Sequence, residues 1–454
     1  MKRFLYLIPG LALSVLTVSC QPNIEEPTAS AADLNLSRYV AFGDYATAGF
    51  MNGGLSRESQ QTAYPAILAK QFALFGANTT FEQPYFSGEG TPMMSLASEN
   101  GVPVIRNAEE FVKLTLADCA GLPSLNKPYG GDLTTLQNFG VPAIKIKQLK
   151  TPGLGNSGNQ NTTGFNPYFE RILPTGDNRS YLEVASASNP TFFTTWFGMS
   201  DVITYIMSGG TCGTLPEEAE FTTEMNTLLD NLTKRQPNGK AERKGVILNL
   251  PSYDDFPIAY VTDLVKVQAD LRTQTGNSNL TIWVKVLKNM NVPSQGEDTV
   301  AVVSKDILTP KGKATLGVQA HGFSKQDPLH SDEVLNYKEI QHLSARMNRY
   351  NVKITDIVKN PAYANQVIVA DMKQLFGTLR NGVIYNGVKY DLAPVKGGVF
   401  SLDNFTLTPR GQAIVANKII QAMNQEVLPK IPQFSGFGTK IPEVNVNDYQ
   451  PMGL

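Results

Sequence analysis

The chain contains few of the residues on which metal centres and disulfide frameworks depend. Its 454 residues include three cysteines and three histidines. No two of the histidines, His321, His330 and His342, stand at metal-ligand spacing beside a suitable carboxylate, and no paired-cysteine motif occurs. We therefore predict a protein without a metal ion or other cofactor.

An excess of charge of either sign is also missing. The chain has 39 basic and 40 acidic residues, for a net charge of -1 at pH 7. The basic residues form no run that would suit a phosphate backbone, which argues against a nucleic-acid partner. Hydrophobic residues make up 42% of the sequence, enough for a sizeable core.

One long apolar run is present, and it stands at the start of the chain. Residues 4–18 are mainly apolar and follow Lys2 and Arg3. The run is too short and too early for a spanning helix, which predicts a secretory signal peptide over residues 1–19. No second apolar stretch in the sequence reaches spanning length.

The residues that close this signal are Ser19 and Cys20. A small residue before a cysteine resembles the cleavage box of bacterial lipoproteins, in which the cysteine is lipidated. Lipid on Cys20 would anchor the mature protein to the outer membrane of a Gram-negative bacterium, on its periplasmic or cell-surface face. The alternative is a plain signal peptide with an incidental cysteine. Residues 20–36, rich in Pro, Ala, Ser and Glu, are predicted to form a flexible tether.

Two further cysteines, Cys119 and Cys212, remain in the mature chain. In an exported protein such a pair can form a disulfide. Their spacing does not decide between a disulfide and two separate buried thiols, so both interpretations stay open.

The pattern of apolar residues predicts strands that alternate with helices. Short apolar runs bounded by turn residues indicate buried strands. These runs lie at 38–42, 143–146, 191–197, 245–250, 281–286 and 366–370. Pro65 suits a first helical turn, and Thr408 followed by Pro409 is a favourable start for a last helix that ends at Pro429. Such alternation predicts an α/β fold with a mostly parallel sheet covered on both faces.

The order of these elements indicates one large domain over residues 37–430. Long stretches rich in Gly, Asn and Pro break the alternation near 76–139 and 151–189, which we interpret as insertions. Residues 431–454 have no apolar period and are predicted to form an irregular tail.

Four blocks of sequence carry a family resemblance. They are Tyr39 to Gly49, Asn138 to Ala143, Phe192 to Asp201 and Ser401 to Gly411. The first block includes Gly43-Asp44-Tyr45-Ala46-Thr47-Ala48-Gly49, which resembles the Gly-Asp-Ser-Leu-Thr-x-Gly of the SGNH (GDSL) ester hydrolases. The other blocks resemble later motifs of that family, in the same order. The resemblance implies a three-layer α/β/α domain of the SGNH or flavodoxin-like type, with long insertions.

The resemblance also places the catalytic positions of the family, and four of them are substituted. Tyr45 stands where the family has its nucleophilic serine, and Ala143 where it has the oxyanion glycine. Ser200 replaces the oxyanion asparagine, and Thr406 replaces the general-base histidine. A phenol with a pKa of about 10 is a poor acyl acceptor, and a threonine hydroxyl cannot shuttle a proton near neutral pH. Only Asp403 is retained, and its carboxylate is available for a hydrogen bond from Tyr45 or Thr406.

A scaffold without its catalytic residues predicts a binding or structural role. In one interpretation the former substrate cleft holds an acyl chain, a glycan or a peptide. The residues expected to line such a ligand site are Asp44, Tyr45, Ser200, Asp403 and Thr406. In a second interpretation the lipid-anchored domain docks on an outer-membrane barrel or transporter.

A third interpretation is a divergent ester hydrolase with a relocated active site. His330 is the one histidine with polar neighbours in a predicted loop, so it is the candidate base. The loop carboxylates Glu89, Asp254 and Asp255 are interpreted as solvated, and Trp196 as part of the core.

Overall fold

A computed structural model describes residues 34–451, apart from 78, 79, 100, 101, 107, 236–238, 240, 241, 291, 364, 365 and 431–439. The predicted signal peptide, Cys20 and most of the predicted tether lie outside the described residues. Leu34 and Leu36 are buried, with 1% and 6% of their surface exposed. These two residues therefore belong to the core, although the tether was predicted to extend to residue 36.

A five-stranded sheet forms the centre of the molecule, and all of its neighbouring strands are parallel. Its strands are β1 (Tyr39–Gly43), β4 (Asn138–Gly140), β5 (Phe192–Trp196), β6 (Lys244–Leu248) and β11 (Val367–Ala370). They lie side by side in the order β11-β6-β5-β1-β4. Every residue of β1 and β5 is buried, as expected for strands covered on both faces. The predicted α/β class is thereby confirmed.

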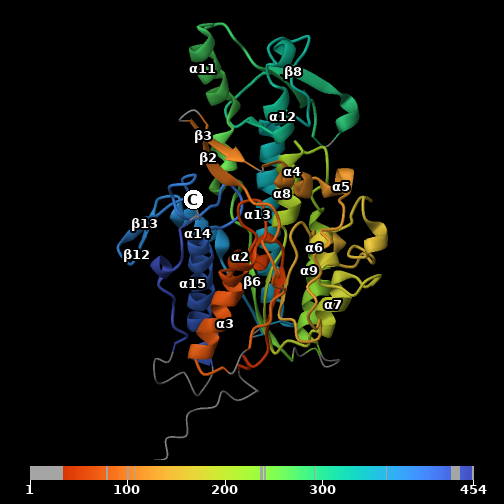
Figure 1. The fold of residues 1–454 in the computed structure, drawn as a ribbon, viewed down its shortest axis with the longest axis vertical. Coiled ribbons are helices and arrows are strands. Elements are labelled where there is room, and N and C mark those ends of the chain that lie inside the picture. The colour runs from red at the N-terminus through yellow and green to blue at the C-terminus, as the bar shows by residue number, and fades with distance from the viewer. Residues whose placement is uncertain are drawn as a thin grey trace, which may run out of the picture.

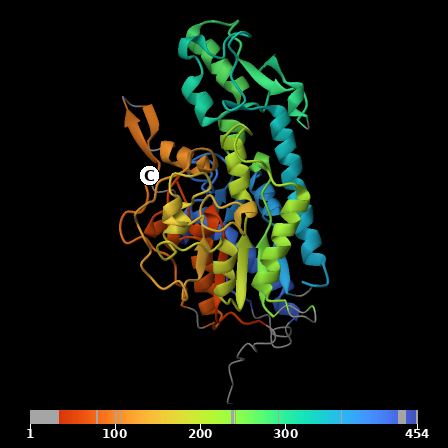
Figure 2. The ribbon, with the colours of Figure 1, turned by 90° about the vertical axis from the view of Figure 1, so that its right-hand side faces the viewer.

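Helices cover the two faces of this sheet (Figures 1 and 2). On one side α3 (Tyr64–Leu74) packs against α15 (Pro409–Glu426), and on the other α9 (Glu218–Thr233) packs against α13 (Tyr337–Lys359) and α7 (Tyr181–Ala187). The Thr408 hydroxyl caps α15 by accepting the Gly411 N–H at 3.0 Å. The last helix therefore starts where the sequence predicts, and it ends at Glu426, just before Pro429.

The strand predicted at residues 143–146 is wrong. The strand of this region is β4, which ends at Gly140, and Ala143 has a φ of 64° that a strand does not allow. A 3-10 turn follows at Ile146–Gln148. Ile144 and Ile146 are fully buried although they lie in a loop. Their apolar character therefore reflects burial and not strand formation.

A small lobe that the sequence analysis did not anticipate occupies residues 263–335. It lies at one end of the long axis of the molecule, above the central sheet in Figure 1. Its elements are α11 (Leu264–Thr275), β7 (Trp283–Leu287), β8 (Glu297–Ala301), β9 (Ile307–Leu308), α12 (Pro310–Thr315) and β10 (Val334–Leu335). The strand predicted at 281–286 exists as β7, but it pairs antiparallel with β8, outside the central sheet. The lobe has a hydrophobic cluster of its own, which includes Leu264, Ile282, Val284 and Leu329.

The predicted insertion at 76–139 contains regular structure. A hairpin of β2 (Ser95–Glu99) and β3 (Val102–Arg106) leads into α4 (Ala108–Thr115) and α5 (Ala117–Ala120). Cys119 of α5 is joined in a disulfide to Cys212, which follows α8 (Met199–Met207). Their Cα atoms are 6.1 Å apart, within the usual range for a disulfide. The pairing that spacing left open is thus present, and it ties the insertion to the main domain.

The C-terminal tail is irregular, as predicted, but its described part is held in place. The Asn417 side chain exchanges hydrogen bonds with the backbone of Val444, and Asn424 does the same with Ile441. Ile441 and Val446 are buried against the core. The described part of the tail therefore packs along α15.

Candidate functional site

The candidate site lies at the carboxyl ends of β1 and β5. In chain order the five strands of the sheet are arranged 2-1-3-4-5, so the connections leave β1 and β5 in opposite directions. A crevice at such a switch point is where open α/β sheets bind ligands. Asp44 directly follows β1, and α8 follows β5 after Gly198. The loop at residues 401–407, which precedes α15, closes the site from a third direction.

Asp44 is buried with 1% of its surface exposed. Its Oδ2 accepts the backbone N–H of Ser200 at 2.9 Å, which ties the end of β1 to the first turn of α8. Burial raises the pKa of Asp44 from 3.8 to about 7, and the nearby Asp201 adds to this rise, while the Ser200 hydrogen bond opposes it. Half of the Asp44 carboxyl groups therefore carry a proton near neutral pH.

Tyr45 begins the short helix α1 (Tyr45–Ala48), and its ring is buried among other aromatic rings. The ring packs edge-to-face on Phe50, with 5.1 Å between centroids, and also contacts Phe111 of α4. Phe111 in turn contacts Phe405, which contacts Phe256. We call the connected set the aromatic plug: Tyr45, Phe50, Phe111, Phe256, Phe376, Phe400 and Phe405.

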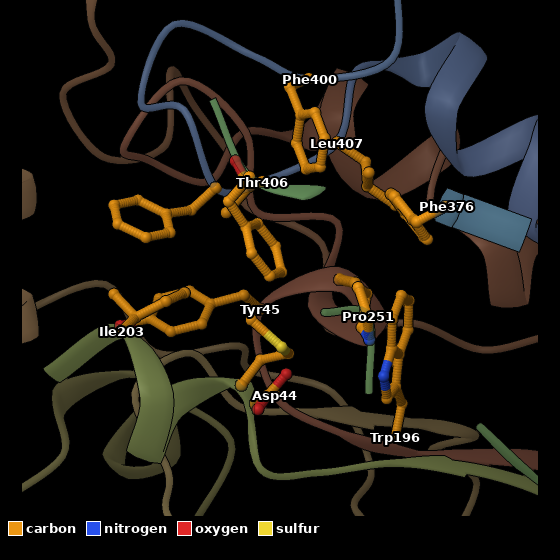
Figure 3. A pocket seen from close by; sticks show the side chains of 13 residues that line it. Asp44, Tyr45, Trp196, Ile203, Pro251, Phe376, Phe400, Thr406 and Leu407 are labelled. Carbon is orange, nitrogen blue, oxygen red and sulfur yellow. The ribbon is translucent and has the colours of Figure 1, made fainter. Parts of the chain in front are cut away.

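The plug leaves almost no space at the end of β1, where the resemblance places the nucleophile. The cavity there has a volume of about 20 Å³ and is lined by Asp44, Tyr45, Thr406 and mostly apolar side chains. Figure 3 shows the Tyr45 ring extending across it toward Ile203, with Phe400 and Leu407 opposite. A cavity of this size holds about one water molecule. The expected acyl chain, glycan or peptide does not fit in this conformation.

Asp403 has a structural task. Its carboxylate accepts the backbone N–H groups of Gly53 (2.9 Å), Phe405 (2.9 Å) and Thr406 (2.7 Å), and also the Thr406 hydroxyl. The bond from Thr406 is one of the two that the sequence analysis proposed for it. Nearby, the Asn52 backbone donates to the Ser401 hydroxyl at 2.9 Å. Asp403 thus fastens the loop after α1 to the loop before α15.

The remaining residues of the predicted site, Ser200 and Ala143, do not line the cavity. Ser200 is fully buried and reaches the site through its backbone bond to Asp44, but its side chain does not line the cavity. Ala143 has left-handed backbone geometry, which a glycine adopts at lower cost, and it too is absent from the cavity wall. The structure therefore gathers Asp44, Tyr45 and Thr406 in one cavity.

The described residues contain no substitute for the catalytic triad. All three histidines are described, and no serine, threonine or cysteine side chain among the described residues donates to a histidine ring. The ring of His321 bonds to the carboxylates of Asp327 and Glu333 instead, and His330 is exposed. A nucleophile and its base have to lie within hydrogen-bond reach of one another. The relocated site proposed around His330 therefore has no nucleophile in contact.

Two other predictions about single residues have different outcomes. Asp255 was interpreted as solvated, but it is fully buried, and its Oδ1 pairs with Arg380 at 2.6 Å. Trp196 is buried and packs against Tyr64, as predicted for a core residue. The sequence could not place Asp255, because its partner lies 125 residues further along the chain.

A much larger cleft lies beside the plug, and the sequence analysis did not find it. It has a volume of about 610 Å³ and is walled by five separate segments of the chain. Its lining includes Met94, Ile105, Phe111, Val112, Leu116, Ile206, Met207, Leu308, Leu402, Asp403 and Phe405, together with Lys113, Lys311 and Lys313. We call it the apolar cleft. Of the five expected ligand-binding residues, only Asp403 lines it.

In comparisons with known proteins, no protein-family model, curated protein or solved structure matches the chain. Among the described helices, none is long and apolar enough to cross a membrane.

We predict that Asp44→Asn stabilises the protein more at pH 8 than at pH 4.5. The folded-state pKa of about 7 exceeds the ordinary value of 3.8. Between these values the native state binds more protons than the unfolded state, so stability falls as the pH rises. An asparagine has no charge to desolvate and can still accept the Ser200 N–H. The gain in the free energy of unfolding should be about 3 kcal/mol larger at pH 8 than at pH 4.5.

Urea unfolding followed by tryptophan fluorescence at the two pH values measures this difference. Asp255→Asn is the matched control, because it removes a buried carboxylate that has an arginine partner. That control should destabilise the protein at pH 8. An equal effect of Asp44→Asn at both pH values would contradict the buried, proton-binding state of Asp44.

Proposed function

We propose that the chain is a non-catalytic relative of the SGNH hydrolases, exported and anchored by lipid at Cys20, that binds an anionic amphiphile in the apolar cleft. The 2-1-3-4-5 order of the parallel sheet is the flavodoxin-like order, which agrees with the resemblance in sequence. Three of the four family blocks meet at the candidate site: the ends of β1 and β5 and the loop at 401–407. Their convergence supports the placement of Tyr45, Ser200, Asp403 and Thr406.

The chemistry of the site supports a role without catalysis. Tyr45 and Thr406 supply neither a serine nucleophile nor a base that titrates near neutrality. The Ser200 hydroxyl is buried away from the cavity, so it cannot stabilise an oxyanion there. The aromatic plug also fills the volume that an ester carbonyl would need.

The apolar cleft is the single observation that carries the proposed ligand. Its volume of about 610 Å³ lies in the range of small-molecule sites. Aliphatic and aromatic side chains form most of its walls, which suits a hydrocarbon chain.

The lysines of the cleft favour an anionic head group. Lys113 pairs with Glu110, and Lys311 pairs with Asp332. For Lys313 no ion pair is formed with any carboxylate of the described chain. Its side chain is accessible to solvent, yet the surrounding protein partly desolvates it and lowers its pKa. A carboxylate or phosphate head would supply the counter-charge that Lys313 lacks.

The position of the cleft agrees with anchoring through the N-terminus. Leu34 precedes β1 and therefore lies at the amino end of that strand, whereas the cleft lies at its carboxyl end. An anchor upstream of Leu34 would leave the cleft facing away from the point of attachment.

We expect the mature protein to bind palmitate saturably, measured by displacement of a fluorescent fatty-acid analogue. Lys313→Glu places a negative charge beside the head group and should weaken palmitate binding at least tenfold, while hexadecanol binding changes little. Ile105→Asp should weaken the binding of both ligands, because it puts a charge on the apolar wall of the cleft. Ile105 itself is already 46% exposed. Lys70→Glu, an exposed lysine of α3, is the matched control and should have no effect. Equal binding by all four proteins, or no saturable binding, would contradict the proposal.

A second candidate function is a structural subunit on an outer-membrane barrel or transporter. One observation favours it: the β2–β3 hairpin projects from the body of the molecule (Figure 2) and carries the exposed Ile105. We expect an affinity purification from detergent-solubilised membranes to recover a stoichiometric membrane protein if this function holds. Ile105→Asp should release that partner, whereas a clean monomer would exclude it.

The hydrolase alternative gives a separate prediction. The wild-type chain should show no turnover of short-chain aryl esters above the level of the Tyr45→Phe variant, since no serine, threonine or cysteine among the described residues donates to a histidine ring. Turnover that His330→Ala abolishes would contradict the proposal and establish a relocated active site.

A further inference from the structure

A cluster of metal-ligating side chains lies in the small lobe, outside the candidate site. His321 follows the 3-10 turn Val318–Ala320, and His330 and Glu333 precede β10. One ligand atom from each of the three residues lies within 4.8 Å of the others. No metal site is predicted from the sequence, because these residues show none of the usual ligand spacings. Two loops of the small lobe bring them together.

The imidazole of His321 is held between two carboxylates. Its Nδ1 lies 2.7 Å from Asp327 Oδ1, and its Nε2 lies 2.9 Å from Glu333 Oε2. Glu333 is itself oriented, because its carboxylate accepts the backbone N–H of His330 at 2.7 Å. The ring of His330 stacks beside that of His321, with 5.7 Å between centroids.

The backbone fixes these positions independently of the side chains. The Gly317 N–H donates to the His321 carbonyl at 2.9 Å, and the Gly322 N–H donates to the Asp327 carbonyl at 2.8 Å. A turn is closed between His330 and Glu333, whose N–H donates to the His330 carbonyl at 3.0 Å. The ligands are therefore positioned by two tight loops before any ion binds.

The chemistry of this set is that of a zinc site with an open position. Two imidazoles and one carboxylate are a recurrent set of protein ligands for Zn²⁺, with water in the fourth place. A carboxylate on the far nitrogen of a ligating histidine fixes its tautomer and ring orientation, as Asp327 does for His321. The Glu333 side chain is 3% exposed and that of His321 is 15% exposed, while His330 faces solvent. The site is thus sheltered on one side and accessible on the other.

We propose that His321, His330 and Glu333 bind one divalent transition-metal ion of the Zn²⁺ class, with Asp327 as the residue that orients His321. The ion takes the place of the proton between His321 Nε2 and Glu333. The positive charge of the ion offsets the negative charges of Glu333 and Asp327. The nearby Asp332 has its own partner, because it is paired with Lys311. The ion would cross-link the two loops of a lobe whose hydrophobic cluster is small. This site does not depend on the ligand proposed for the apolar cleft.

The test is a titration of the chelator-treated full mature chain with Co²⁺, followed by competition with Zn²⁺. Tetrahedral or five-coordinate Co²⁺ gives visible absorption far stronger than that of the hydrated ion, so the spectrum reports the ligand set as well as binding. We expect saturation at one equivalent. His330→Ala should weaken binding at least tenfold and weaken the visible band; it alters an exposed side chain, so the fold should be retained.

Two further variants separate a metal site from a hydrogen-bonded cluster of the same residues. Asp327→Asn should weaken binding by about 10- to 100-fold, because it removes an orienting contact and leaves the ligands in place. His342→Ala on α13 is the matched control and should bind like the wild type. Absence of saturable binding at one equivalent would overturn the proposal, and so would equal binding by the wild type and His330→Ala.

Discussion

The position of the Tyr45 ring at the end of β1 determines how the neighbouring aromatic side chains pack. Tyr45 follows β1, a strand that is buried along its whole length. Its ring therefore cannot reach solvent, and other side chains have to cover it. Phe50 covers it from the same segment, Phe111 from the first insertion and Phe405 from the loop before α15. Because protein interiors are close-packed, these rings leave only about 20 Å³ at the switch point of the sheet. Space for a ligand is found instead on the outer side of the plug.

Two buried carboxylates beside the plug illustrate how strongly local partners decide the state of a charge. Asp403 receives four hydrogen bonds and holds two loops together. Burial raises the pKa of Asp44 to about 7, the like charge of Asp201 adds to the rise, and the hydrogen bond from the Ser200 backbone offsets only part of it. The end of β1 therefore carries a buried carboxylate whose charged form is disfavoured by the surrounding core.

The small lobe adds two features to the molecule. Its helix α12 supplies Lys311 and Lys313 to one wall of the apolar cleft. The backbone of Glu333 accepts the N–H of Thr309, the residue that caps α12. The histidine cluster and the cleft wall are therefore connected through a single turn of backbone.

Local patterns in the sequence determined much of the main domain. The runs at 38–42, 191–197, 245–250 and 366–370 became central strands, because a strand buried on both faces needs continuous apolar residues. The start of α15 followed from Thr408 and Pro409, which act within one turn. The resemblance that places Tyr45 and Thr406 at catalytic positions also came from the sequence alone, and it stays a prediction. Tertiary structure alone decided the rest, since each remaining feature depends on partners from distant segments. Four features are contacts of this kind: the aromatic plug, the ion pair of Asp255, the walls of the apolar cleft and the contact of His321 with Glu333. The spacing of residues along the chain does not predict such contacts.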